Sequence, residues 1–354
     1  MLTVRLLKKP AWILAAILTV ALLLKQGLVW QRTEFYQAAK LLAGEWGEQK
    51  GEFARGEAGT GPAEFCLGED GVLYILDSGN GRIQVYNQHG RRQQEVRLPE
   101  GGPFNLLAVD EKDDIFTLDI AGEKIVRLAP AGDVLDTYPL GDGEEEKREL
   151  YTVEDIQTGE PGALYVQEAI LYRYSVVYRL RRLDTRVGEW KMIHAVTIEN
   201  TGGVQQEGGF PPEQKVNSFA VNRRGNIYLE SKAGDRLRQL DLITRRGQAG
   251  QSSSVVLPGQ EKILRIATAG VDARGRMYLH INPGAAVSLL CRVDQRPMAA
   301  PLLPDQIISL PPATQRVRVD RKGNLYLLRT GEEGVTMEKY ILRSGFRRRG
   351  NQAG

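Results

Sequence analysis

Cysteine and histidine are scarce in this chain, whose 354 residues include two cysteines and three histidines. Cys66 and Cys291 are too few for the small domains that depend on several disulfide bridges. Both lie in apolar runs, so we interpret them as buried free thiols, with a bridge or a reactive thiol as the alternative. His89, His194 and His280 show no ligand spacing, and the sequence therefore predicts no zinc site.

An excess of one charge is also absent, because 47 basic residues face 44 acidic ones and the net charge is +3. A nucleic-acid binder would show a basic domain or stripe, so we expect no nucleic-acid partner. No Gly-x-Ser-x-Gly elbow, P-loop or Cys/His pair occurs. The sequence therefore identifies no catalytic residue and favours a protein that is not an enzyme, and it predicts no metal ligand and no cofactor.

One long apolar run stands out. Residues Ala11–Leu24 carry no charge, and the apolar character resumes up to Trp30. From residue 11 to residue 30 a helix would span about 30 Å, the thickness of the hydrocarbon core. Basic residues without an acid precede the run, which favours a cytoplasmic N-terminus at 1–10, a transmembrane signal anchor at 11–30 and an extracytoplasmic remainder. A cleaved signal peptide and a buried globular helix are the alternatives.

A repeated pattern fills the chain from residue 61 onward. An apolar run ends in Asp or Asn, a turn containing glycine follows, and an apolar–aromatic pair begins the next run; Phe65–Asp77 is the clearest copy. The aromatics recur at intervals of 42 to 63 residues, close to the spacing of propeller blades. They are Tyr74, Phe116, Tyr165, Tyr228, Tyr278 and Tyr326.

Each repeat predicts strands and hairpins, because short apolar runs alternate with glycine turns that need a positive φ. We expect each aromatic to pack against the following blade, so that neighbouring sheets share a core. An acid and a base also face each other across several hairpins, which we interpret as structural ion pairs. These pairs are Asp77 with Arg82, Asp119 with Lys124, and Glu230 with Arg236.

The stretch from Gly61-Pro62 through Gly71–Asp77 to Asn80–Tyr86 resembles an NHL repeat. The resemblance implies an all-β fold, a six-bladed β-propeller of four-stranded blades, here preceded by one transmembrane helix. The expected divisions after the anchor are a stalk or lead-in at 31–60, the propeller at 61–345, and a basic, disordered tail at 346–354. Two ways of closing the ring stay open: residues 37–43 supply the outer strand of blade six, or they continue the helix as a stalk.

The resemblance also implies a function, since NHL propellers mostly serve as binding platforms. We predict a membrane-tethered, extracytoplasmic binding or scaffold module, with a protein or small ligand on one propeller face and the membrane as a second partner through residues 11–30. A metal-dependent hydrolase or lyase that uses the central channel is the alternative, because some related six-bladed propellers are such enzymes. Calcium stays possible, because six inner strands could bring distant carboxylates together, but no set of residues demands it.

The third repeat departs from the pattern. The segment Leu171–Arg182 predicts one long strand with tyrosines on one face and arginines on the other. Tyrosine and arginine dominate binding hot spots, so this edge is the candidate binding site, with simple packing of a long hairpin as the alternative. The candidate residues are Tyr172, Arg173, Tyr174, Tyr178 and Arg179. Long loops are expected at 190–214, 245–260 and 295–313.

Overall fold

The computed structural model describes residues 30–56, 61–62, 64–141, 148–173, 175–199, 204–207, 216–233, 237–246, 248–256, 265–284, 287–294, 306–310 and 314–348. Within these ranges the chain is built of strands, and no helix there is long and apolar enough to cross a membrane. Residues 11–29 of the predicted anchor lie outside the described residues. Trp30, predicted as the end of that helix, instead begins a strand.

The strands form six sheets, taken here as blades one to six in chain order. Blade one has β2 (Glu64–Leu67), β3 (Leu73–Asp77), β4 (Arg82–Tyr86) and β5 (Arg92–Arg97). Blade two has β6 (Phe104–Val109), β7 (Ile115–Asp119), β8 (Lys124–Leu128) and β9 (Val134–Pro139). Blade three has five strands: β10 (Arg148–Thr158), β11 (Ala163–Tyr172), β12 (Ser175–Asp184), β13 (Glu189–Glu199) and β14 (Val204–Glu207).

The remaining three blades follow the same antiparallel plan. Blade four has β15 (Val216–Val221), β16 (Ile227–Lys232), β17 (Leu237–Ile243) and β18 (Ala249–Val256). Blade five has β19 (Arg265–Val271), β20 (Arg276–Gly284), β21 (Val287–Asp294) and β22 (Gln306–Leu310). Blade six has β23 (Thr314–Val319), β24 (Leu325–Thr330), β25 (Gly334–Arg348) and, as its outermost strand, β1 (Trp30–Glu45).

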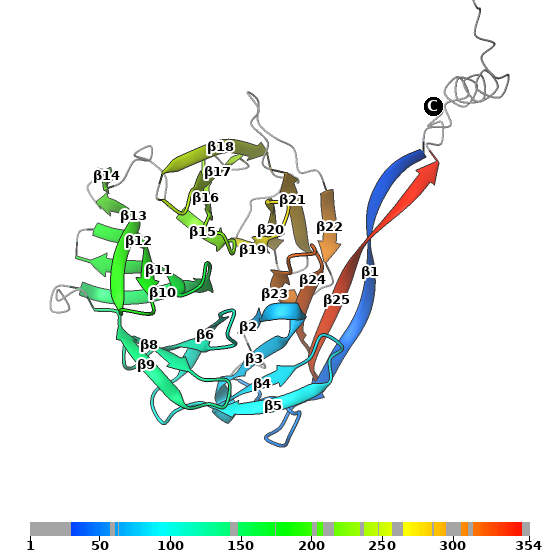
Figure 1. Ribbon diagram of the computed structural model, residues 1–354, viewed down its shortest axis with the longest axis horizontal. Coiled ribbons are helices and arrows are strands. Elements are labelled where there is room, and N and C mark those ends of the chain that lie inside the picture. Colours follow the sequence, from blue (N-terminus) through cyan, green and yellow to red (C-terminus); the bar gives the residue numbers. More distant parts are fainter. Residues whose placement is uncertain are drawn as a thin grey trace, which may run out of the picture. The chain divides into compact units, whose positions relative to one another are not determined.

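The blades are arranged as a ring within the compact unit Ala38–Tyr340. The first strand of each blade lies nearest the ring centre (Figure 1). Each of these inner strands contacts the next around the circle, in the order β2, β6, β10, β15, β19 and β23, and β23 returns to β2. The prediction of an all-β, six-bladed propeller is therefore confirmed.

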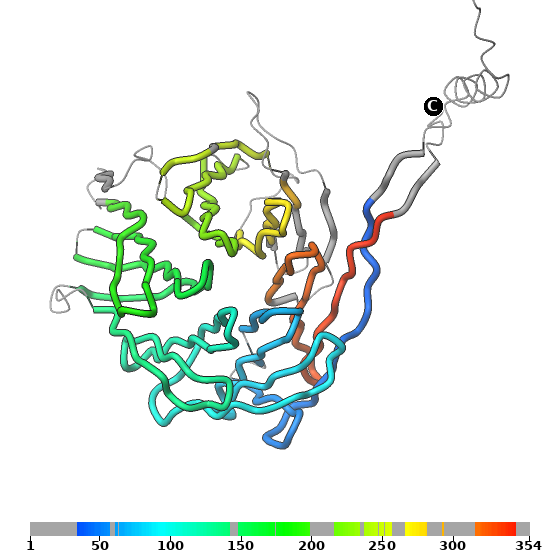
Figure 2. Tube along the Cα trace, viewed as in Figure 1, coloured from blue at the N-terminus to red at the C-terminus, as the bar shows by residue number. Residues whose placement is uncertain are grey.

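The ring is closed by strands from both ends of the chain. β1 pairs with β25 and completes the sheet of blade six, and the coloured parts of the two strands run side by side in Figure 2. Residues 31–60 are thus not a separate stalk, because their first part supplies this outer strand. After it, Phe53 is buried beneath the blade and its amide donates to the Glu45 carbonyl at 2.9 Å. β25 continues to Arg348, into the predicted tail; residues 349–354 lie outside the described residues.

The recurring aromatics occupy similar positions, each being the second or third residue of the second strand of its blade. All six are buried, and all but Tyr278 share an apolar cluster with residues of the following blade. Tyr74 of blade one shares an apolar cluster with Leu107 of blade two, and Tyr326 of blade six packs with Phe65 and Ile75 of blade one. These contacts confirm the prediction of a core shared between blades. Burying each large side chain contributes about 1.5–3 kcal/mol to stability.

The predicted ion pairs are confirmed in two of three cases. Asp77 accepts from the Arg82 Nε at 2.9 Å, and Asp119 lies 3.5 Å from the Lys124 ammonium. Glu230 instead contacts Arg238, at 3.2 Å. The proposed partner, Arg236, lies outside the described residues. The predicted long loops were also wrong in part, since β13, β14, β18 and β22 run through them.

Candidate functional site

The predicted tyrosine and arginine edge does not form one strand. β11 ends at Tyr172, and β12 begins at Ser175, which pairs directly with Tyr172 across a two-residue turn. The reversal places Tyr172 and Tyr178 on opposite faces of the sheet, so the predicted tyrosine face was wrong. Arg173 is exposed at the turn, and Tyr178 is half-buried on β12. Tyr174 lies outside the described residues.

Arg179, the last residue of that set, is buried between blades two and three. Its Nε donates to the Glu168 carboxylate at 2.6 Å, and the same carboxylate accepts hydrogen bonds from Arg181 and from the Tyr151 hydroxyl. Glu168 is fully buried and Arg179 is 9% exposed. The guanidinium of Arg179 is therefore part of the blade interface and is not presented to a partner.

A different set of residues is presented by the turns that join the first and second strands of the blades. We call this side of the ring the turn face. It comprises Gly68–Val72, Asp110–Asp114, Gly159–Gly162, Asn222–Asn226, Asp272–Gly275 and Asp320–Asn324. The turns join through hydrogen bonds between blades, among them Tyr74 to Asp113, Thr158 to the Val109 carbonyl, and the Ala273 amide to the Arg321 carbonyl.

Four of these turns share one construction. In blade six the Asp320 carboxylate accepts hydrogen bonds from the amides of Lys322 and Asn324, at 2.8 and 2.9 Å. Gly323 takes a φ of +81°, a left-handed conformation that costs glycine nothing. The same bonds occur at Asp110, Asn222 and Asp272. The first and fourth residues therefore hold the turn, and the two between them are left for the surface.

These two middle positions differ sharply between the halves of the ring. Blades four to six place basic side chains there, and blades one and two place mostly acidic ones. We define the basic crescent as Arg223, Arg224, Arg274, Arg321 and Lys322, all exposed or half-exposed. We define the acidic patch as Glu69, Asp70 and Glu111; Lys112, the other middle residue of blade two, is an exposed base beside it. The turn of blade three adds neither sign, because Glu160 is buried against Arg182 and Tyr165.

Glu69 links the two halves. Its carboxylate contacts Arg223 of blade four and lies 3.6 Å from the guanidinium of Arg321 of blade six. Partial burial, and then repulsion from Arg321, lower the pKa of Arg223 to about 10. Arg223 is still protonated at neutral pH, so two guanidinium groups share a single carboxylate. The site consequently keeps an excess of positive charge.

Beneath the turn face, side chains of opposite blades meet at the ring centre. Arg318 of blade six lies 2.9 Å from Glu64 of blade one and 3.8 Å from Asp155 of blade three. Arg316 holds the second oxygen of Glu64 at 3.0 Å. Although burial opposes it, the attraction of Glu64 and Asp155 raises the pKa of Arg318. This network pairs charges from blades one, three and six.

The same network bears on a divalent cation at the ring centre. Both oxygens of Glu64 face arginines, and Asp155 is shared between Arg318 and the amide of Gln157. A calcium site needs several oxygen ligands that are free to coordinate. Among the described residues, no three His, Cys, Asp or Glu side chains lie close enough to hold a metal ion. This donor set therefore does not fit calcium.

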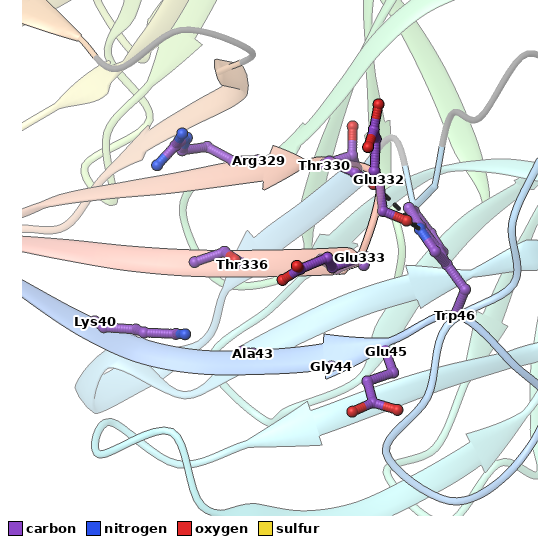
Figure 3. A pocket seen from close by; sticks show the side chains of 13 residues that line it. Lys40, Ala43, Gly44, Glu45, Trp46, Arg329, Thr330, Glu332, Glu333 and Thr336 are labelled. Atoms are coloured by element: carbon purple, nitrogen blue, oxygen red, sulfur yellow. Dashed lines mark hydrogen bonds between the residues drawn. The ribbon is translucent and has the colours of Figure 1, made fainter.

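A pocket of about 900 Å³ lies on blade six, between the end of β1 and the β24–β25 turn. Figure 3 shows the indole of Trp46 directed at that turn, where its Nε1 donates to the carbonyls of Gly331 and Glu332 at 3.1 and 2.9 Å. Arg329 in its wall is bound to Glu338 at 2.8 Å. Its most distinctive side chains thus brace the blade, and its lining charges are of both signs.

Known structures resemble the chain in fold. A member of the DUF4221 family from Bacteroides vulgatus is 12% identical, with 89% of this chain and 99% of that chain covered and a TM-score of 0.51. Virginiamycin B lyase from Staphylococcus aureus is 13% identical, with 88% and 100% covered and a TM-score of 0.46. The WD40 repeats of RRP9 are 11% identical, with 79% and 93% covered and a TM-score of 0.48. No family model and no curated protein sequence matches.

Sequence reasoning missed the turn face although its signal is printed in the chain. The turns Asn222–Asn226, Asp272–Gly275 and Asp320–Asn324 were used only as evidence for hairpins. When the two middle residues of these turns are compared from one repeat to the next, the basic character of three successive blades is evident. That the three blades are neighbours in the ring follows from the fold, and so does the convergence of Arg223 and Arg321 on Glu69.

Proposed function

We propose that this chain is a binding module whose partner docks on the turn face. The observation that supports it most directly is the convergence of Arg223 and Arg321, from two different blades, on the one carboxylate of Glu69. Arginine is among the residues that most often dominate binding energy at interfaces. The backbone that carries these side chains is held by hydrogen bonds inside each turn and between blades, so little ordering accompanies binding.

The ring centre favours binding over catalysis. A metal-dependent hydrolase or lyase would use free carboxylates or amides around the axis, whereas Glu64 and Asp155 are held by Arg316 and Arg318. The enzymatic alternative therefore has no observation that favours it.

We further propose that the propeller belongs with the NHL-like propellers and is tethered to the cell membrane on its extracytoplasmic side. The support is in the sequence: the repeat of blade one, and the uncharged run Ala11–Leu24 preceded by basic residues. Before protease treatment, the propeller should be found in the membrane fraction. Protease added to intact cells should then degrade it. Protection of the propeller until the membrane is opened would contradict this placement.

Site-specific photo-crosslinking in native membranes tests the docking face. Ala273 is an exposed, uncharged residue in the blade-five turn, and Ala121 is an exposed alanine in the β7–β8 turn, at the opposite end of the strands. A photoreactive residue at 273 should give a discrete crosslinked species that one at 121 does not give. Crosslinking from 121 alone, or equally from both, would contradict docking on the turn face.

A further inference from the structure

The charges of the turn face are divided between the two halves of the ring. The basic crescent comes from blades four, five and six, and the acidic patch comes from blades one and two. Blades four, five and six follow one another around the ring, and so do blades one and two, so most of each sign lies on one side. At physiological ionic strength the Debye length is about 8 Å, so a bound chain senses mainly the half that it contacts.

We propose that the partner is a polypeptide with an acidic segment followed or preceded by a basic one, the acidic segment lying on the basic crescent and the basic segment on the acidic patch. This inference rests on the proposed function and names the chemistry of the ligand. Opposite potentials that face each other fix the register of a complex and speed its formation. A uniformly anionic ligand, such as a nucleic acid or an anionic lipid surface, matches only one half.

Glu69 shows how the acidic segment would be received. In the free protein the Glu69 carboxylate forms an ion pair with Arg223 and lies within ion-pair distance of Arg321. A glutamate or aspartate of the partner offers the same group at the same place. All three side chains are at least one-third exposed, so the exchange needs no opening of the core. Glu69 therefore acts as an internal competitor that sets how acidic a partner must be.

The test uses the full-length chain in detergent and a fluorescein-labelled peptide of four glutamates, two glycines and four lysines. Anisotropy should report binding that weakens as salt is raised. The double variant Arg223→Glu and Arg321→Glu should weaken binding by about tenfold or more, because attraction becomes repulsion. Arg97→Glu, an exposed arginine at the other end of the blade-one strands, should leave it unchanged. If the double variant folds poorly, Lys322→Glu replaces it as the test, because Lys322 is exposed; this variant should weaken peptide binding to a smaller extent.

Three comparison probes decide the ligand class. A peptide of the same composition with alternating charges should bind more weakly, because it cannot match two separated halves. A single-stranded oligonucleotide and vesicles rich in phosphatidylserine should also bind more weakly. Binding of either at least as tight as that of the block peptide, and sensitive to the same double variant, would overturn the proposal in favour of a polyanion.

Glu69→Gln supplies the last arm. Because Glu69 also belongs to the acidic patch, the probe here is a peptide of the four glutamates alone; removing the competitor should tighten its binding about two- to fivefold, the range expected for an exposed ion pair. Unchanged or weaker binding would overturn the competitor role. If crosslinking from residue 273 persists while the block peptide does not bind, the charge inference fails and the docking face stands. Loss of the 273 crosslink would overturn the proposed function itself.

Discussion

Replacing Glu168 by glutamine should destabilise the ring far more than removing a surface carboxylate in the same blade. Glu168 is fully buried, and its oxygens bind Arg179, Arg181 and the Tyr151 hydroxyl. The substitution keeps the shape of the side chain and removes its charge. Two guanidinium groups, 9% and 8% exposed, then lose the carboxylate that they share.

The magnitude follows from burial. Removing one member of a buried pair costs about 3–5 kcal/mol, because the other charge stays out of water without compensation. Asp184 and Arg186 provide the matched control, since their ion pair has the same 2.6 Å distance but Arg186 is 69% exposed. An exposed pair contributes about 0–1 kcal/mol. We therefore expect Glu168→Gln to cost at least about 2 kcal/mol more than Asp184→Asn.

Urea denaturation followed by tryptophan fluorescence measures the difference. The ring of Trp190 lies 4.3 Å from the Arg181 guanidinium, so its emission reports on this blade boundary. Far-ultraviolet circular dichroism should give the same midpoints if the ring unfolds as one unit. Equal losses for Glu168→Gln and Asp184→Asn would refute the argument that burial sets the cost. A loss confined to the fluorescence signal would mean that blade three opens locally.

Three further predictions test other parts of the fold. Tyr326→Phe should cost about 0.5–1.5 kcal/mol through the lost hydroxyl bond to Asp320, and Tyr326→Ala about 3–5 kcal/mol through the lost packing, both by urea denaturation; equal losses would contradict the role of the ring. Gly81→Ala should cost about 1–2 kcal/mol of stability, because the φ of Gly81 is +62° and nothing lies near the added Cβ. Gly90→Ala should cost about 1–3 kcal/mol more, because its Cβ would also meet the Leu41 carbonyl of β1 at 1.9 Å. Similar losses would argue against β1 lying on this turn. Burial raises the pKa of Glu230 from 4.5 to about 7, so the folded state holds this proton more tightly than the unfolded chain. The bound proton stabilises the fold fully below pH 4.5, and this contribution is lost as the pH rises to 7. Urea denaturation should therefore show Glu230→Gln gaining about 3 kcal/mol relative to the unaltered protein between pH 4.5 and 7, and a constant difference would contradict the shift.

Local chemistry explains why much of the architecture could be predicted. The turn at Asp320–Asn324 is specified by one acceptor side chain and one glycine, and both can be read without knowing the fold. The aromatic that follows is the largest apolar group in each unit, so its burial is demanded by its own surface. The hydroxyl of Tyr278 even binds the carboxylate that holds its turn, Asp272, at 3.2 Å. Short-range signals of this kind recur in every blade.

The failures occur where the decisive contact is distant in the chain. The β11–β12 turn has no glycine, proline or asparagine, so Arg173 and Tyr174 looked like the middle of a strand. Arg179 looked like a surface arginine because Glu168 becomes its neighbour only when β11 and β12 pair. The outer strands β18 and β22 carry weak patterns because one side of each is unpaired. Ring closure by β1 depends on a pairing between the two ends of the chain, for which no local signal exists.

The turn motif also separates what folding requires from what it leaves free. In Asn222–Asn226, Asp272–Gly275 and Asp320–Asn324, the first and fourth residues satisfy the backbone, and the aromatic after the turn anchors the blade. The two middle side chains take no part in these bonds, so the turn itself does not select their charge. The ion pairs of Glu69 with Arg223 and Arg321 balance part of the positive charge, but five basic side chains face three acidic ones, and like charges brought together cost stability. A bound partner that offsets this repulsion explains the excess, which is why the charge reversal of Arg223 and Arg321 should change binding far more than it changes the urea midpoint.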